Sequence, residues 1–316
     1  MNQPAANVDA PQRGGVRRPS ARGPWRRFKL VVRLIVLAAI VAGIMTGCDR
    51  MFYYPSKRVW NTPSQFGLPH EEVRFATVDG VELHGWFLPA ASVLRDGTRA
   101  PGAVRGTVLH FHGNAENVSA HLVLIEWLPR HGYNVLMFDY RGYGQSSGCV
   151  TRAGTILDGH AAVDYLLTRP DVDGSRLFAY GQSLGGAIAV VVAAERRELR
   201  AVVVESGFAS YRGLASQHVP GASIAPWLGR AAAGALVSSG YDPIDVIGRI
   251  APRPVLLIAA EHDRICFPEQ SEELYAAAGE PKELWIARGA AHLGILDAAG
   301  DELQERVVNW FERARE

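Results

Sequence analysis

The chain is short of cysteine, of net charge and of long apolar runs. Its three cysteines cannot all pair, so no disulfide framework is implied. A formal net charge of +1 over 316 residues argues against a polybasic nucleic-acid binder, and 48% apolar with 21% charged residues excludes a disordered chain, a collagen or a coiled coil. The apolar run at 34–45 has 12 residues, whereas a membrane-spanning helix needs about 20. We therefore expect an ordinary globular body with no nucleic-acid partner.

The positive charge is concentrated at the N-terminus. Residues 1–47 hold eight basic residues and a single acidic one, and end in the apolar run. A run of this length fits the core of a signal peptide, about 7–15 residues, better than a permanent anchor. Without this leader, 25 basic and 31 acidic residues remain, a net charge of −6. The body should therefore have little electrostatic attraction to anionic lipid.

A cysteine follows the apolar run within the sequence TGCD at 46–49. A small residue before a cysteine at the end of an apolar core resembles the lipobox of bacterial lipoproteins, although Met45 replaces the usual leucine. The resemblance implies cleavage before Cys48, a lipid on its thiol and, with Asp49 next, retention on the periplasmic face of an inner membrane. An uncleaved signal anchor is the alternative, which also exports the body, and an intracellular fate is the third possibility.

The chain divides into three predicted parts. Residues 1–47 form a signal peptide or signal anchor, 48–70 a tether that leads into the domain, and 71–316 one α/β domain with a short helical insertion at about 210–248. Aromatic residues in the tether are expected to rest on a membrane or on the protein itself. They are Phe52, Tyr53, Tyr54 and Trp60.

Short apolar runs alternate with helical patterns along the body. The earliest two predicted strands, 72–78 and 81–88, are joined by Asp79-Gly80, which is a strong hairpin signal. A hairpin followed by alternating strands and helices predicts a mostly parallel sheet with helices on both faces. Residues 90–105 are expected to form a surface loop. The later strands are predicted at 107–111, 134–138, 176–180, 201–204, 254–259 and 283–286, and helices at 118–130, 155–168, 184–196 and 269–278.

A serine lies in a glycine-rich turn between a predicted strand and a predicted helix. The sequence GQSLGG at 181–186 has the pattern G-x-S-x-G, which in this context is typical of a nucleophile elbow. The glycines are needed because side chains there would collide with the neighbouring strand and helix. The turn would expose the Ser183 hydroxyl at the start of a helix, with the Leu184 N–H free to bind an anion.

Two further stretches accompany the elbow, HFHGNAEN at 110–117 and FDYRGYGQS at 138–146. With them, the chain from about Phe75 to its C-terminus resembles the α/β-hydrolase superfamily, and within it serine-aminopeptidase-like and dienelactone-hydrolase-like esterases and thioesterases. The resemblance implies an α/β-hydrolase fold with the helical insertion over the active site. The sequence GCVTR at 148–152 departs from the family pattern, so the loop there is not carried over.

A catalytic base is expected among the histidines that follow Ser183, because the triad of this fold runs in the order Ser, Asp or Glu, then His. His218 lies in the insertion with no strand before it, and His262 adjoins the best acid candidate. His292 alone follows a predicted strand and precedes the final helix. We therefore assign His292 as the general base.

The acid of the triad has two candidates. Asp263 follows the predicted strand 254–259 and matches the family's post-strand aspartate, whereas Glu205 ends the preceding strand, a position that carries the acid in some relatives. We favour Asp263. Asp242 and Asp245 are interpreted as turn and cap residues.

The oxyanion hole requires two converging donors. One should be the Leu184 backbone N–H, and the other should come from the loop after the strand 107–111. By resemblance we choose the Asn114 N–H, with Ala115 as the near alternative.

Other combinations of reactive side chains are less informative. His110 and His112 would share one face of a strand, but no further His, Asp or Cys cluster has zinc-like spacing, so we predict no metal site and a packing role for the pair. Cys149 and Cys266 follow different strands, and we expect no disulfide between them.

The sequence as a whole predicts a serine hydrolase that cleaves an ester or thioester through an acyl-enzyme. His292 would deprotonate Ser183 and Asp263 would orient the imidazole, without a metal or organic cofactor. The partners would be a small-molecule or acyl-chain substrate and the membrane, through the N-terminal lipid or anchor. The alternatives are a serine peptidase, a perhydrolase, or a non-catalytic binding protein on the same fold.

Overall fold

The computed structural model describes most of the body of the chain. The predicted leader 1–47 and the predicted lipidation site Cys48 lie outside the described residues. Within the described part, no helix combines the length and apolarity needed to cross a membrane. The described residues are 51–90, 92–93, 99–100, 104–221 and 223–314.

An eight-stranded sheet runs through the centre of the domain. Its strands are β2 (Glu71–Ala76), β3 (Glu82–Leu88), β6 (Gly106–Phe111), β8 (Tyr133–Phe138), β9 (Leu177–Gln182), β10 (Leu199–Glu205), β11 (Val255–Ala260) and β12 (Lys282–Ala287). The order across the sheet is β12-β11-β10-β9-β6-β8-β3-β2. The strands from β12 to β8 pair in parallel, whereas β3 pairs antiparallel with both β8 and β2. The sheet is therefore mostly parallel and begins with the predicted hairpin.

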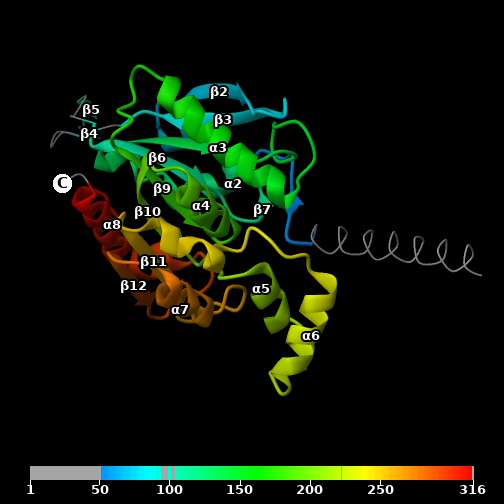
Figure 1. Ribbon diagram of the computed structural model, residues 1–316. Coiled ribbons are helices and arrows are strands. Elements are labelled where there is room, and N and C mark those ends of the chain that lie inside the picture. The colour runs from blue at the N-terminus through cyan, green and yellow to red at the C-terminus, as the bar shows by residue number, and fades with distance from the viewer. Residues whose placement is uncertain (1–50, 91, 94–98, 101–103, 222, 315–316) are drawn as a thin grey trace, which may run out of the picture. The chain divides into compact units, whose positions relative to one another are not determined.

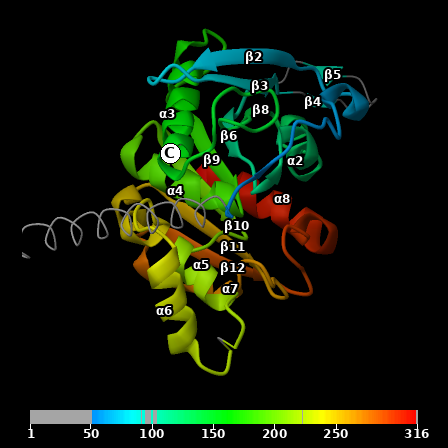
Figure 2. The same ribbon diagram turned by 90° about the vertical axis from the view of Figure 1, so that its right-hand side faces the viewer.

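Helices cover both faces of this sheet. They are α2 (Val118–Ile125), α3 (Arg152–Thr168), α4 (Leu184–Glu195), α5 (Tyr211–Gln217), α6 (Pro226–Leu236), α7 (Pro268–Ala277) and α8 (Ile295–Arg313). Figure 2 shows α3 and α4 on one face and α2 and α8 on the other. Two apolar clusters correspond to the two faces, one containing the side chains of α3 and α4 and the other those of α2 and α8. This layering explains why every residue of β6, β8, β9 and β11 is buried and why these strands read as continuous apolar runs.

The architecture confirms the predicted α/β-hydrolase fold, with local differences. The helix expected at 118–130 ends at Ile125, and a separate 3₁₀ turn forms at Pro129–His131, where a proline occupies the first position of the turn. The stretch 90–105, expected as a loop, contains two antiparallel two-residue strands, β4 (Ser92–Val93) and β5 (Arg99–Ala100). Pairs this short leave no periodicity that a sequence pattern could reveal.

The insertion after β10 consists of α5 and α6. It stands out from the body beside α7 (Figure 1). Only Gly229 and Ala233 of α6 are buried, because this helix rests on α5 by its small residues. Its larger apolar side chains remain exposed, among them those of Trp227, Leu228 and Leu236.

The residues that lead into the domain are part of its structure. We call residues 52–61 the N-terminal arm. Two of its aromatic side chains, Phe52 and Tyr53, are buried in the core, whereas Tyr54 is 59% and Trp60 39% exposed. A short strand in the arm, β1 (Tyr54–Pro55), pairs in parallel with β7 (Ala115–Glu116) in the loop after β6. The expected contact with the protein is thus observed for Phe52 and Tyr53, whereas Tyr54 and Trp60 are exposed.

A buried ion pair anchors the loop after β8 to α3. The guanidinium of Arg141 lies 2.8 Å from the carboxylate of Asp158, which is fully buried, and 2.7 Å from Asp79 of the hairpin turn. Asp158 also accepts a hydrogen bond from the backbone N–H of Arg141. Burial raises the pKa of Asp158 to about 6 despite the adjacent cation, so this carboxylate depends on its partner.

We expect Arg141→Leu to lower the free energy of unfolding by about 3–5 kcal/mol, because it leaves the Asp158 carboxylate buried without its counter-ion. Arg74→Leu is the matched control. It breaks a pair between exposed side chains, Arg74 and Glu82, and should cost less than about 1 kcal/mol. Urea unfolding of both variants measures the difference, and equal losses would contradict this interpretation.

Candidate active site

Ser183 occupies a strained turn between β9 and α4. Its backbone φ is +54°, in the left-handed region that non-glycine residues rarely adopt. The strain is imposed by close approach of the surrounding backbone. A Cβ on Gly185 would collide with the carbonyl oxygen of Phe111 on β6, and one on Gly181 with the backbone of Gly185. The glycines of the G-x-S-x-G pattern therefore allow the turn to fit between β6 and α4.

Three residues from separate loops meet at this turn. The imidazole Nε2 of His292 lies 3.1 Å from the Ser183 hydroxyl oxygen, and its Nδ1 lies 2.7 Å from Asp263 Oδ2. Because a carboxylate accepts, the proton of the imidazole belongs on Nδ1, and Nε2 is then free to accept the hydroxyl proton. This is the hydrogen-bonding arrangement of a nucleophile, a base and an orienting acid.

Asp263 is held by its own loop. Its second oxygen, Oδ1, accepts hydrogen bonds from the backbone N–H groups of Ile265 at 2.8 Å and Cys266 at 2.9 Å. The side chain is buried, so both oxygens are fixed by hydrogen bonds rather than by solvent. The imidazole of His292 is thereby held in one orientation.

Glu205, the rival acid, has other partners. Its carboxylate accepts hydrogen bonds from the Tyr180 hydroxyl at 2.6 Å and from the Gln182 side chain at 2.8 Å. Burial raises the pKa of Glu205 above its usual value. The structure therefore places Asp263, not Glu205, in contact with His292.

The other two histidines after Ser183 lie apart from this group. His218 Nε2 is hydrogen-bonded to the carbonyl of Ile265 at the edge of the insertion. His262 is exposed beside Glu261. Asp242, interpreted as a turn or cap residue, accepts the backbone N–H of Tyr211 at the start of α5.

The loop after β6, residues 112–116, adjoins the N-terminus of α4, and we call it the oxyanion loop. The Leu184 and Asn114 N–H groups have no protein acceptor among the described residues, so both are available to a ligand. The carbonyl groups of the loop, in contrast, are bound by side chains. His112 O accepts from Tyr140 Oη at 3.0 Å, Gly113 O from His112 Nδ1 at 2.8 Å, Asn114 O from Tyr143 Oη at 2.7 Å and Ala115 O from His121 Nε2 at 3.1 Å.

These contacts give a role to residues that sequence reasoning left without one. Tyr140 and Tyr143 belong to the stretch 138–146 that supported the family resemblance, but the sequence offered no reason for their hydroxyl groups. The only signal in the sequence was the resemblance of this stretch to the α/β-hydrolase superfamily, which marked these residues without explaining their hydroxyl groups. The N-terminal arm was missed as a neighbour of the loop because its strand has only two residues.

Burial keeps the histidines near the loop in their neutral form. Burial lowers the pKa of His110 to about 3, and that of His121 to about 4. His110 is hydrogen-bonded to Gln182 at 3.0 Å. Across the part of the chain that the structure describes, no group of three His, Cys, Asp or Glu side chains could hold a metal ion.

Cys149 and Cys266 are both free. Cys149 is exposed, whereas Cys266 is buried with its sulfur 3.9 Å from the Ser183 hydroxyl oxygen. Burial raises the pKa of Cys266 to about 12, so its thiol is neutral at physiological pH. A neutral thiol is a poor nucleophile, and Ser183 remains the candidate nucleophile.

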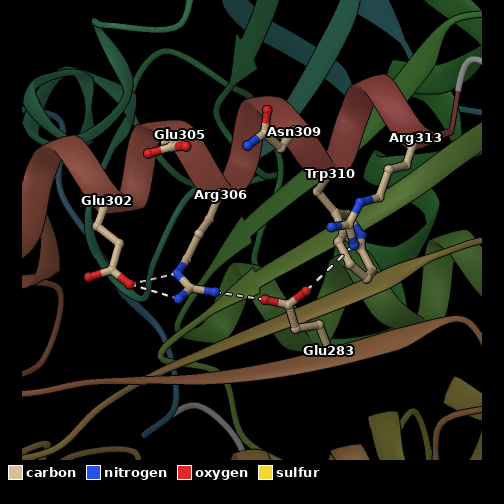
Figure 3. Close-up of a pocket in the computed structure, with 7 residues that line it drawn as sticks. All are labelled: Glu283, Glu302, Glu305, Arg306, Asn309, Trp310 and Arg313. Carbon is tan, nitrogen blue, oxygen red and sulfur yellow. Dashed lines mark hydrogen bonds and ion pairs between the residues drawn. The ribbon is translucent and has the colours of Figure 1, made fainter.

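Two pockets differ in their relation to this site. A pocket of about 400 Å³ between α8 and β12 contains none of the three aligned residues. Its Arg306 is bound within the pocket to Glu302 and Glu283 (Figure 3). A pocket of about 720 Å³ lies between the insertion and α7 and is lined in part by Phe267, the neighbour of Cys266. None of the three aligned residues lines the second pocket either, and its link to the site is Phe267, which follows Cys266 in the chain.

Several known proteins are similar to this chain in sequence. The family described as serine aminopeptidase, S33 matches residues 102–253. YfhR of Escherichia coli (strain K12) is 35% identical over 90% of this chain and 94% of its own length. The protein WAV2 of Arabidopsis thaliana, an α/β hydrolase domain-containing protein, is 31% identical over 77% of this chain and 79% of its own length. The chain belongs to the α/β-hydrolase superfamily.

Solved structures support this membership. The esterase Pf2001 of Pyrococcus furiosus superposes on this α/β hydrolase with a TM-score of 0.66 at 26% sequence identity, covering 83% of this chain and 98% of that one. The α/β hydrolase GrgF of Penicillium sp. sh18, at 21% identity and a TM-score of 0.63, shares the fold. The relatives together support a hydrolase.

Because α4 and β6 approach closely at Gly185, a single added methyl group there should affect stability strongly. Gly185→Ala should lower the free energy of unfolding by about 1–3 kcal/mol or more, because the added Cβ would force α4 away from β6. Gly234→Ala on α6 is the control, since open space surrounds it and alanine should stabilise that helix by about 0.5–1 kcal/mol. The urea midpoints of the two variants should therefore move in opposite directions. A higher midpoint for Gly185→Ala would show that α4 and β6 have room for the methyl group.

Proposed function

We propose that this α/β hydrolase is a serine hydrolase that cleaves a carboxylic ester or thioester through an acyl-enzyme. The observation that carries the proposal is the continuous hydrogen-bonded series from Ser183 through His292 to Asp263, with distances of 3.1 and 2.7 Å. Ester chemistry is favoured over amide chemistry by the likeness to the Pyrococcus furiosus esterase.

The acylation step uses this series directly. As Ser183 Oγ attacks the substrate carbonyl carbon, His292 Nε2 takes the hydroxyl proton and the imidazolium is stabilised by Asp263. The carbonyl oxygen becomes an oxyanion, which the Leu184 and Asn114 N–H groups can bind. His292 then donates its proton to the departing alcohol or thiol, and the acyl group remains on Ser183.

Deacylation repeats the same steps with water as the nucleophile. His292 Nε2 removes a proton from a water molecule, whose oxygen attacks the acyl carbon, and then returns the proton to Ser183 Oγ as the acid leaves. We assign the acyl or leaving group to the pocket between the insertion and α7, and the size of this pocket would set which groups fit.

A serine peptidase on the same triad is the second candidate. It is favoured by the family match at residues 102–253, whose description is a serine aminopeptidase. The chemical steps would be identical, with an amine as the leaving group. A non-catalytic binding protein is disfavoured because the aligned triad has no function in binding alone.

We further propose that the body is exported and held at the periplasmic face of the inner membrane by a lipid on Cys48. The N-terminal arm starts four residues after Cys48, and five residues lie between Cys48 and Tyr54, so this length of chain reaches at most about 20 Å. Since Tyr54 pairs with the oxyanion loop, such an anchor would keep the catalytic residues near the membrane surface. An acyl-chain substrate at that surface fits this position.

Replacing the acid tests the proposed function. Asp263→Asn should lower kcat for a short-chain p-nitrophenyl ester about 10⁴-fold, because the amide disfavours the Nδ1-protonated imidazole. A fluorophosphonate probe should label Ser183 in the folded protein and should leave Ser183→Ala unlabelled. Glu205→Gln is the matched control, and its activity should change little because Glu205 does not touch His292.

An active Asp263→Asn protein together with an inactive Glu205→Gln protein would show that the acid is Glu205. The absence of both labelling and turnover in the wild-type protein would point to the non-catalytic alternative. A panel of esters, thioesters and aminoacyl amides, with Ser183→Ala as blank, separates the esterase from the peptidase.

Lipidation predicts a particular N-terminus. Mass spectrometry of the membrane-bound protein should find a chain that begins at a diacylglyceryl-modified Cys48, and Cys48→Ser should remain uncleaved and incorporate no labelled fatty acid. A protein that retains Met1 and carries an unmodified Cys48 would contradict the lipoprotein proposal.

A further inference from the structure

Asn114 is fixed by two contacts that come from different parts of the chain. The hydroxyl of Tyr143 donates to its backbone carbonyl at 2.7 Å. The backbone N–H of Tyr54, in the N-terminal arm, donates to its side-chain Oδ1 at 2.9 Å. The residue that carries the candidate oxyanion donor is therefore held at both its carbonyl and its side chain.

The arm is attached to the same loop along β1 and β7. Tyr54 lies opposite Ala115, and the N–H of Ser56 donates to the carbonyl of Glu116 at 2.9 Å. Glu116 has a φ of +69°, a left-handed conformation that needs support from its surroundings in a non-glycine residue. The bond from Ser56 provides part of that support.

The arm also ties the oxyanion loop to the loop that contains Tyr143. The carbonyl of Ser56 accepts one hydrogen bond from the Asn117 side chain at 2.9 Å and another from the Gly144 N–H at 3.0 Å. Asn117 follows the oxyanion loop and Gly144 follows Tyr143. The arm, the oxyanion loop and the Tyr143 loop thus form one hydrogen-bonded unit.

We propose that Tyr143 and the N-terminal arm are positioning elements of the catalytic centre, which clamp Asn114 so that the N–H groups of the oxyanion loop point at the developing oxyanion. The proposal rests on the proposed function, since the clamp matters to catalysis only if an oxyanion forms there. Neither element touches the reacting atoms; both act through Asn114.

The geometry of the peptide group explains how the clamp works. In a trans peptide the C=O and the following N–H point in opposite directions, so binding the Asn114 carbonyl from one side directs the Ala115 N–H to the other. The Gly113 carbonyl, bound by His112, directs the Asn114 N–H in the same manner. Burial raises the pKa of Tyr143 above its usual value, so its hydroxyl stays protonated and able to donate. Both candidate donors are therefore oriented by contacts on their carbonyl partners.

Tyr143→Phe is the principal test, because it removes one hydroxyl and keeps the ring. We expect kcat for the ester to fall about ten- to hundredfold with KM nearly unchanged, since a misplaced donor weakens binding of the transition state only. A trifluoromethyl ketone analogue, which forms an oxyanion on Ser183, should lose affinity by the same factor as kcat/KM.

Tyr133→Phe is the matched control for a merely structural role. Tyr133 is also buried, and its hydroxyl donates to Glu312 on α8, away from the site. Both variants lose a buried hydroxyl, so their melting temperatures should fall by similar amounts. Only Tyr143→Phe should alter kcat and the affinity for the ketone.

The arm is tested by Asn117→Asp in the full chain. Aspartate can still cap α2 by accepting the Ser119 N–H, as Asn117 does, but it cannot donate to the carbonyls of Ser56 and Arg58. We expect a fall in kcat of the same kind as for Tyr143→Phe. Asn134→Asp, a buried amide that bonds Ala90 and Thr107 instead, should leave kcat unchanged.

The outcomes separate this proposal from the proposed function. If the wild-type protein hydrolyses the ester through Ser183 and Tyr143→Phe keeps its full kcat and ketone affinity, the clamp is wrong and the serine hydrolase stands. If Tyr143→Phe and Tyr133→Phe lose kcat equally, the clamp is also wrong, since the effect then follows stability. If the wild-type protein neither turns over nor reacts at Ser183, both proposals fall together.

Discussion

The close approach of α4 to β6 is the constraint on which the rest of the site depends. The backbones are so near that Gly185 has no room for a side chain against Phe111. Ser183 is consequently forced to a φ of +54° at the start of the helix, with its hydroxyl toward His292 and the Leu184 N–H beside it. One steric requirement thus positions the proposed nucleophile and one proposed oxyanion donor together.

The second feature is the way in which the oxyanion loop satisfies its backbone. Four successive carbonyls, from His112 to Ala115, are bound by tyrosine hydroxyls and imidazole nitrogens. Buried carbonyls need such partners for stability alone, but the same contacts leave the N–H groups of Leu184 and Asn114 without protein acceptors among the described residues. Stability and the proposed site for an anion therefore arise from one arrangement, to which the N-terminal arm contributes from about 60 residues away in the sequence.

Sequence reasoning located the elements of the fold well where patterns are long and failed where they are short. The strands of the sheet and the hairpin at Asp79-Gly80 lie close to their predicted positions because buried strands read as apolar runs. The strand pairs β1–β7 and β4–β5 were not expected, because each of these strands has only two residues and so shows no alternation of apolar and polar side chains. The G-x-S-x-G turn indicated Ser183, chain order and a preceding strand indicated His292, and the family resemblance favoured Asp263 over Glu205. The structure brings Ser183, Asp263 and His292 within hydrogen-bonding distance.

What the sequence determined by itself is local: the glycine-bounded turn, the alternation of strands and helices, and the order in which reactive residues follow strands. These depend on backbone sterics and on the periodicity of apolar side chains, which can be read along one chain. Only the tertiary structure decided between Asp263 and Glu205, and only it showed that Tyr143 and the N-terminal arm meet at Asn114. Such contacts join residues far apart in the chain, and their distances depend on how the sheet and its loops pack in three dimensions.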